Sequence, residues 1–157
     1  MKWRTSNDIC KMTLLYVDDD ADVTKMVIKF LSKNYPTQEI IDAENGFDAL
    51  YKIEEYDPDI LLVDLFMPFM DGIRFVEHIL KKSAERQVIF LSVCNDPQMI
   101  RRCLATGARY YITKPINFDS LFYTIDTLML EIFYKRIHHA KQTPLKGRGS
   151  VSISTRH

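Results

Sequence analysis

The sequence has little cysteine, no long apolar run and no net charge, and each absence narrows the classes of protein to consider. Its 157 residues contain only three cysteines, Cys10, Cys94 and Cys103, and no CxxC pair, so we expect neither a disulfide framework nor a zinc site. No apolar stretch approaches the roughly 18 residues that span a bilayer, and residues 1–11 lack the apolar core of a signal peptide. We therefore expect a soluble, cytoplasmic protein.

Charge gives no overall indication of a nucleic-acid or membrane partner, because there are 21 basic and 21 acidic residues. Residues 132–157, however, contain six basic residues and no acidic one, which leaves 15 basic against 21 acidic residues, a net charge of −6, in residues 1–131. We divide the chain into an N-terminal extension (1–11), one domain (12–138) and a basic tail (139–157) without fixed structure. The tail could be a linker, a docking segment or a cloning remnant, and it is too short for a helix-turn-helix.

Short apolar runs alternate with segments whose apolar residues recur at helical spacing, a pattern typical of βαβ units around a parallel sheet. The predicted strands cover residues 12–17, 39–43, 60–63, 88–91 and 110–113. The first two predicted helices are centred on residues 23–30 and 49–53, and the others cover residues 73–82, 97–104 and 119–138. Right-handed crossovers between these elements predict an α/β fold, a doubly wound five-stranded parallel sheet with five helices.

Four of the predicted strands end in side chains that can bind an ion or a phosphate. The first runs into Asp18 and Asp19, the third into Asp64, the fourth into Ser92 and the fifth into Lys114. Ligands of open parallel sheets bind outside the carboxyl ends of the strands. We therefore expect three carboxylates, a hydroxyl and an ammonium group to meet in one crevice.

Three carboxylates in one crevice repel one another and favour a cation between them. Mg²⁺ is a suitable partner, because it takes one or two carboxylates and completes its coordination with waters and phosphate oxygens. A lysine and a hydroxyl could hold the remaining oxygens of a phosphoryl group, and a carboxylate can itself be the nucleophile that accepts it. The pattern therefore predicts aspartyl-phosphate chemistry.

Four motifs resemble the receiver domain of bacterial two-component response regulators over about residues 12–138. They are Leu-Tyr-Val-Asp-Asp-Asp at 15–20, Val-Asp-Leu-Phe-Met-Pro-Phe-Met-Asp-Gly at 63–72, Phe-Leu-Ser at 90–92 and Gly-Ala-Arg-Tyr-Tyr-Ile-Thr-Lys-Pro at 107–115. The resemblance implies the flavodoxin-like receiver fold with strand order 2-1-3-4-5. It also implies a signalling domain and not an enzyme, with only its own phosphorylation and dephosphorylation as reactions.

The resemblance implies a metal and phosphoacceptor site. Asp64 would accept a phosphoryl group from a sensor histidine kinase or phosphotransfer protein. Asp18, Asp19, Asp64 and the backbone carbonyl of Phe66 would bind Mg²⁺, or Mn²⁺ in its place, with Asp19 the more direct of the first two.

The resemblance also implies a switch beside that site. Ser92 and Lys114 would bind the phosphoryl group, and Tyr111 would turn inward once Ser92 has moved. Tyr110 competes with Tyr111 for this role, and the family register favours Tyr111. The bond before Pro115 is a candidate cis peptide.

Other polar residues near these motifs have simpler readings. We prefer Asp20 as the cap of the first helix over a metal ligand. Asp71-Gly72 is interpreted as turn chemistry, and the histidines, including His138 and His139, as solvated side chains.

The sequence departs from the family at the positions around the site. Val93 follows the switch hydroxyl where the family usually has a small residue, and Phe66 and Cys94 are apolar at two variable flanking positions. We hypothesise that these three side chains modulate access, so that the phosphoryl group is long-lived and small donors load it slowly.

The last predicted helix carries more apolar residues than one inward stripe needs, namely Phe122, Met129, Phe133 and Tyr134. Half of this surplus could be local packing, but an outward apolar face usually marks an interface. With the fourth helix (97–104) and fifth strand (110–113) it forms the face by which receivers commonly bind targets or dimerise. We therefore expect a downstream effector or a second copy as the partner there, and no nucleic acid or membrane.

Two other functions remain open. A Mg²⁺-dependent aspartyl phosphohydrolase would place a second acid two residues after the nucleophile, where this chain has Phe66. A receiver-like module that signals without phosphorylation would not need every key position to carry its functional residue type. The cognate kinase and the output cannot be read from the sequence.

Overall fold

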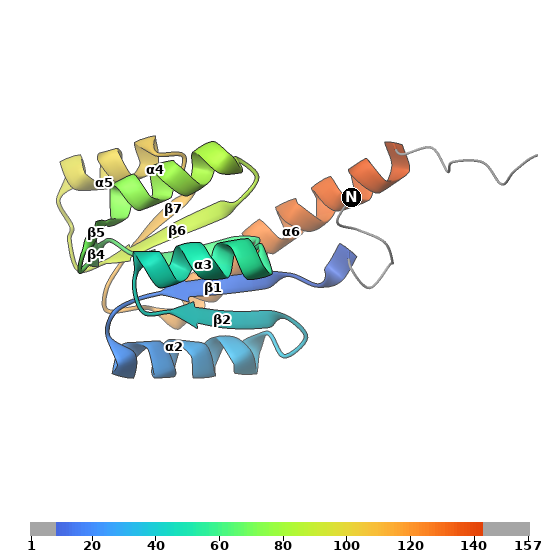
Figure 1. Ribbon diagram of the computed structural model, residues 1–157. Coiled ribbons are helices and arrows are strands. Elements are labelled where there is room, and N and C mark those ends of the chain that lie inside the picture. The colour runs from blue at the N-terminus through green and yellow to red at the C-terminus, as the bar shows by residue number, and fades with distance from the viewer. Residues whose placement is uncertain (1–8, 143–157) are drawn as a thin grey trace, which may run out of the picture.

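The chain folds around a central parallel sheet with helices on both of its faces (Figure 1). The computed structural model describes residues 9–142. In chain order the elements are β1 (Thr13–Val17), α2 (Ala21–Asn34), β2 (Glu39–Ala43), α3 (Gly46–Tyr56), β3 (Ile60–Asp64), β4 (Phe66–Met67), β5 (Met70–Asp71), α4 (Gly72–Lys82), β6 (Gln87–Ser92), α5 (Pro97–Ala105), β7 (Tyr110–Thr113) and α6 (Phe118–Gln142).

The five long strands pair in parallel in the order β2-β1-β3-β6-β7. This is the order 2-1-3-4-5 of the sequence prediction, which is confirmed. Every residue of β1, β3 and β6 is buried, as expected for central strands covered on both faces. The register aligns the strand ends, because Val17 pairs with Val63 and Asp64 pairs with Leu91. The residues that follow these strands therefore emerge at the same edge of the sheet.

Two apolar clusters, one on each face of the sheet, form the core. Side chains of α3, α4 and α5 pack on one face with Leu15, Val17, Leu61, Val63, Val88 and Phe90. Side chains of α2 and α6 pack on the other face with Leu14, Tyr16, Ile60, Leu62, Ile89 and Leu91. The odd and even positions of each central strand point to opposite clusters, which is the period of two of a β-strand.

Short acidic residues begin the helices near the carboxyl edge of the sheet. The side chain of Asp20 accepts hydrogen bonds from the backbone N–H groups of Asp22 and Val23, at 3.0 and 3.1 Å, and caps α2 as predicted. Asp71 likewise accepts from the N–H of Ile73 at 2.9 Å and caps α4. Both carboxylates therefore have a local structural role.

A small hairpin between β3 and α4 was not predicted. Phe66 and Met67 of β4 pair antiparallel with Asp71 and Met70 of β5, and Phe69 in the turn has φ +67°. After the hairpin, Gly72 lies so close to the backbone of Leu65 that a Cβ would stand 2.6 Å from its carbonyl oxygen. Two-residue strands leave no period in the sequence, so pattern reading could not find them.

The last helix is longer than predicted and is held by a buried arginine. Within the described residues α6 continues to Gln142, past the predicted end near His138, and Ala140, Lys141 and Gln142 are good helix formers. The Arg136 guanidinium donates to the carbonyls of Ile9 and Lys11 at 3.1 and 2.9 Å and pairs with Asp59 at 2.7 Å. We call these contacts the Arg136 clasp.

The predicted terminal segments fall partly beyond the described residues. Residues 1–8 of the predicted extension and 143–157 of the predicted tail lie outside them, whereas residues 139–142 continue α6. Neither α6 nor any other helix in the described part of the chain combines the length and apolar character needed to cross a membrane.

Candidate metal and phosphoacceptor site

The three predicted carboxylates converge at the carboxyl edge of the sheet. Asp18 and Asp19 follow β1 and Asp64 ends β3, and one carboxylate oxygen from each lies within 4.8 Å of the others. Asp18 and Asp64 are buried, whereas Asp19 is exposed. The group is therefore open to solvent on the side of Asp19.

Lys114, which follows the edge strand β7, also reaches this group of carboxylates. Its Nζ lies 3.0 Å from Oδ2 of Asp18 and 3.6 Å from Oδ1 of Asp64. Its backbone N–H donates to the carbonyl of Ser92 at 2.7 Å, which ties the ends of β6 and β7 together. The Lys114–Pro115 peptide bond is cis. One ammonium group thus serves two of the three carboxylates.

The pKa values of the two buried carboxylates are shifted in opposite directions. Burial raises the pKa of Asp64 to about 6; Lys114 opposes this rise, and the charges of Asp18 and Asp19 add to it. Burial also acts to raise the pKa of Asp18, but hydrogen bonds from Tyr16, the Asp20 N–H and Lys114 outweigh it and leave that pKa below its usual value. Asp64 is therefore the carboxyl that most needs a further positive charge nearby.

The donor set fits a hard divalent cation. It offers carboxylate oxygens, no thiolate and no imidazole, which suits Mg²⁺ or Mn²⁺. An exposed ligand, Asp19, leaves a path for water and for a phosphate oxygen to complete the coordination. Close by, the backbone N–H of Phe66 acts to lower the pKa of the Asp64 carboxyl.

The predicted switch residues, Ser92 of β6 and Tyr111 of β7, lie on neighbouring strands near the carboxyl edge of the sheet. Ser92 is fully buried, and its Oγ accepts a hydrogen bond from the Cys94 N–H at 3.1 Å. The Tyr111 hydroxyl donates to the carbonyl of Cys94 at 2.6 Å. Tyr111 packs against the α3–α4–α5 cluster, whereas Tyr110 packs against the α2–α6 cluster. Of the two tyrosines, Tyr111 is thus the one bonded to the loop that follows Ser92.

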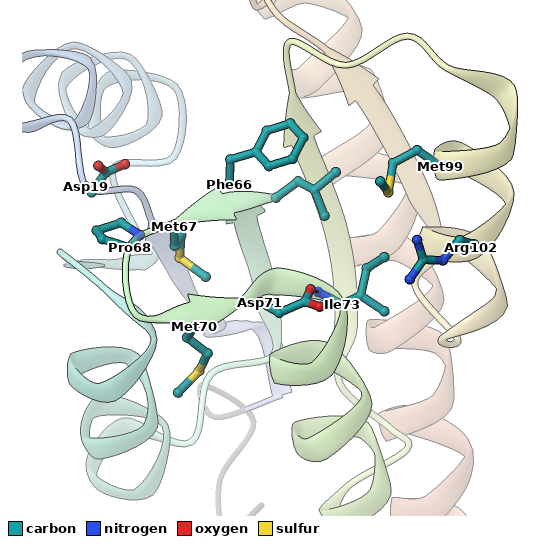
Figure 2. Close-up of a pocket in the computed structure, with 10 residues that line it drawn as sticks. Asp19, Phe66, Met67, Pro68, Met70, Asp71, Ile73, Met99 and Arg102 are labelled. Atoms are coloured by element: carbon teal, nitrogen blue, oxygen red, sulfur yellow. Dashed lines mark hydrogen bonds between the residues drawn. The ribbon is translucent and has the colours of Figure 1, made fainter.

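The three side chains predicted to modulate access differ in exposure. Phe66 is 53% exposed, Val93 is 72% exposed and Cys94 is partly buried. Phe66 lines an open groove of about 700 Å³ between the β4–β5 hairpin and α5 (Figure 2). Its lining includes Asp19 and is otherwise mostly apolar, with Arg102 at the α5 side.

Sequence reasoning missed two parts of this region. It did not predict the groove, because the hairpin that forms one wall was not recognised. It also did not single out Tyr16, whose hydroxyl donates to Oδ2 of Asp18 at 2.6 Å. The sequence did contain a signal for this contact. Tyr16 and Asp18 are two residues apart, and residues i and i+2 of a strand lie on the same face.

The family model for the response regulator receiver domain matches residues 14–126. The chain is 31% identical to the chemotaxis protein CheY of Listeria monocytogenes over 115 residues, 73% of this chain and 97% of that protein. It is 33% identical to CheY of Bacillus subtilis over 113 residues, 72% of this chain and 93% of that protein.

Solved structures agree with these sequence matches. The signal receiver domain of a DNA binding response regulator from Colwellia psychrerythraea superimposes with a TM-score of 0.72 at 31% identity, over 74% of this chain and 97% of that one. The family match covers well over half of the chain and includes every residue of the site. The chain therefore belongs to the response regulator receiver domain family, a family of signalling domains.

Proposed function

We propose that the chain is a phosphorylation switch in which Asp64 accepts a phosphoryl group from a sensor histidine kinase or a phosphotransfer protein. The observation that carries this proposal is the meeting of Asp18, Asp19, Asp64 and Lys114 at one edge of the sheet. A carboxylate oxygen of Asp64 attacks phosphorus, the bond from phosphorus to the donor nitrogen breaks, and the donor leaves with that electron pair.

The residues around Asp64 have distinct parts in this transfer. Lys114 is close enough to Asp64 to pair with a phosphoryl oxygen, and the Phe66 N–H favours the charged form of the acceptor carboxyl. Asp18 and Asp19, with Asp64 and the Phe66 carbonyl, would hold Mg²⁺ or Mn²⁺. That cation, when bound, supplies positive charge to the transferring group.

The switch follows from the hydrogen bonds of Ser92 and Tyr111. Ser92 would turn its hydroxyl to donate to a phosphoryl oxygen, which breaks its contact with the Cys94 N–H. Tyr111 is bonded to the carbonyl of the same residue and would follow inward. Moving a two-state equilibrium from mostly inactive to mostly active takes roughly 5.5 kcal/mol, which a few charge-assisted hydrogen bonds can supply.

The proposal is tested by intact-mass spectrometry after incubation with acetyl phosphate and Mg²⁺, followed by peptide mapping. We expect one phosphoryl group per chain, on Asp64. A chain that stays unmodified with this donor and with purified histidine kinases would favour the non-phosphorylated module, and turnover of free phosphate esters would favour the phosphohydrolase.

We further propose that Phe66, Val93 and Cys94 slow the access of water and of small donors to Asp64. A Phe66→Asn, Cys94→Glu double variant is expected to lose its phosphoryl group about tenfold faster, a barrier change of about 1.4 kcal/mol. Phosphoryl lifetime is measured by the decay of the modified mass after the donor is removed.

Phe69→Asn provides the matched control for that experiment. It makes the same change of side chain on the same hairpin, but Phe69 is 89% exposed in the turn. It should leave the lifetime unchanged. A double variant that decays at the parent's rate would show that these side chains do not limit access.

The output surface is proposed on α5, β7 and α6, with a downstream effector or a second copy as partner. Of the four apolar residues that α6 carries beyond its inward stripe, Phe122, Met129 and Phe133 are partly buried against the core. Tyr134 is exposed, as are Tyr123 and Leu130; the three side chains are 65%, 76% and 69% exposed. Apolar side chains this exposed on one helix mark a contact surface.

Sedimentation with and without beryllofluoride, a phosphoryl mimic, tests for a second copy. We expect the mimic to favour a dimer, and a Leu130→Glu, Tyr134→Glu variant to stay monomeric. Tyr51→Glu, at a 66% exposed tyrosine of α3, should dimerise like the parent. A monomer at high concentration in both states would leave an effector as the partner of this surface. A cytoplasmic location and a lack of nucleic-acid contact by this chain stay predictions.

A further inference from the structure

Tyr16 is a fully buried tyrosine in the middle of the sheet whose hydroxyl points at the candidate metal site. Its ring packs in the α2–α6 cluster with Leu14 and Leu62. Its hydroxyl donates to Oδ2 of Asp18 at 2.6 Å and makes no other hydrogen bond among residues 9–142. Buried hydroxyl groups need a partner, so this hydroxyl restrains the carboxylate on which it depends.

The strand geometry makes this contact direct. Tyr16 and Asp18 are two residues apart and lie on the same face of the chain leaving β1. The tyrosine side chain is long enough to run along the strand from the core to the carboxyl edge. The core packing of the ring therefore sets where the hydroxyl lies, and the hydroxyl sets where Oδ2 of Asp18 lies.

The other contacts of Asp18 show what the hydroxyl does to the site. Oδ2 accepts from Tyr16 and from Lys114, at 2.6 and 3.0 Å, whereas Oδ1 accepts, among the residues that the structure describes, only from the Asp20 N–H, at 2.9 Å. A carboxylate oxygen has about two positions for acceptor contacts. Oδ2 is therefore filled, and Oδ1 keeps one position for a cation.

Lys114 alone would not hold Asp18 in this orientation throughout the reaction. Its ammonium group is also 3.6 Å from Asp64, where the phosphoryl group would form, and its side chain is 18% exposed. A phosphoryl group on Asp64 attracts this ammonium group away from Asp18. Tyr16 has no such second partner in the described part of the chain.

We propose that Tyr16 is a positioning residue: its hydroxyl occupies Oδ2 of Asp18, presents Oδ1 to the divalent cation and retains the carboxylate when Lys114 turns to the phosphoryl group. The inference rests on the proposed function, because it assumes a cation at this site. It adds a residue that acts on the cation only through Asp18.

Tyr16→Phe tests the role, because it removes one oxygen and keeps the ring. We expect the affinity for Mg²⁺, measured by calorimetric titration without any phosphodonor, to fall about tenfold, the low end of the effect of losing an outer partner of a metal ligand. The folded state of each variant is checked by thermal unfolding without metal.

Tyr35→Phe is the matched control. The Tyr35 side chain is also buried, and its hydroxyl donates to the Asp126 carboxylate at 2.9 Å, but that pair lies between α2 and α6 outside the acidic cluster. It should lose stability in the same way and keep the parent's Mg²⁺ affinity.

The outcomes separate this inference from the proposed function. A parent chain that binds Mg²⁺ but takes up no phosphoryl group would sink the proposed function, and the comparison of Tyr16→Phe with Tyr35→Phe would still decide the role of Tyr16. An unchanged Mg²⁺ affinity in Tyr16→Phe, an equal loss in Tyr35→Phe, or a parent that binds no Mg²⁺ would each overturn the inference.

Discussion

Asp64→Asn is expected to abolish phosphoryl uptake while the fold remains intact. The amide that replaces the carboxylate is not a nucleophile for phosphorus, and Asp18 and Asp19 are proposed as metal ligands and not as acceptors. Intact-mass spectrometry after acetyl phosphate and Mg²⁺ should therefore show no modified chain. Uptake equal to that of the parent would mean that another residue is the acceptor.

Asp71→Asn controls for the loss of a carboxylate near the same groove. Asp71 lines the groove and caps α4, and asparagine caps helices about as well as aspartate. This variant should take up the phosphoryl group as the parent does. The pair of variants thus separates the loss of the acceptor from a general loss of acidity beside the site.

Asp64→Asn should also change how the metal-free protein responds to pH. The folded chain holds the Asp64 proton with a pKa of about 6, against an ordinary value of 3.8, so folding is favoured below the lower value and that contribution is lost as pH rises through about 6. The difference of about two pKa units corresponds to about 3 kcal/mol. The pKa of Asp18 is lowered, so its contribution has the opposite sign and is lost as pH falls below about 4.

Urea unfolding with a chelator present, from pH 4 to pH 8, measures this difference. The parent should lose stability between pH 4 and about pH 6 and stay level above it, and Asp64→Asn should be nearly level throughout and more stable than the parent at pH 8. Parallel curves for the two proteins would contradict the raised pKa of Asp64.

Arg136→Met is expected to destabilise the protein by about 3–5 kcal/mol, the usual cost of removing one partner of a buried ion pair. The Arg136 and Asp59 side chains are only 4% and 15% exposed, so Asp59 would be left as a largely buried charge. The carbonyls of Ile9 and Lys11 would lose their donor as well. Equilibrium unfolding in urea at neutral pH gives the free energy directly.

Arg109→Met provides the comparison for that measurement. Arg109 pairs with Glu131 at 2.7 Å, but the two side chains are 39% and 37% exposed, so solvent screens their attraction. Its loss should cost about 1 kcal/mol or less. If both variants lost the same free energy, the burial of the Arg136 clasp would not be what makes it stabilising.

The sequence predicted the sheet, and the side chains that meet at its carboxyl edge, because both depend on strong, regular signals. Buried parallel strands read as apolar runs, and a strand that ends in Asp64 or Lys114 must present that residue at the shared edge. The hairpin at Phe66 to Asp71 was missed because strands of two residues have no period. The clasp was missed because Arg136 looks in sequence like one more basic residue of a helix, and only the fold brings Asp59 to it.

The sequence also could not show which side chains of α6 point toward the core. The sequence placed Phe122 and Phe133 on faces next to the inward stripe and could not decide which of these apolar residues pack locally. In the structure, α2 lies beside α6 and widens the apolar surface that α6 can cover: Phe122 packs edge-on to Tyr35, with ring centroids 5.8 Å apart. A second neighbouring helix, and not the sheet alone, decides which faces of α6 are buried.

The Arg136 clasp has a mechanical consequence. With 25 residues, α6 is about 37 Å long, and it starts after Lys114 at the carboxyl edge of the sheet and is tied to Asp59, at the start of β3, near its other end. The helix is therefore anchored near both of its ends. A displacement beside Asp64 is expected to tilt or rotate α6 as one rigid helix as far as Gln142, because the Arg136 clasp opposes local fraying.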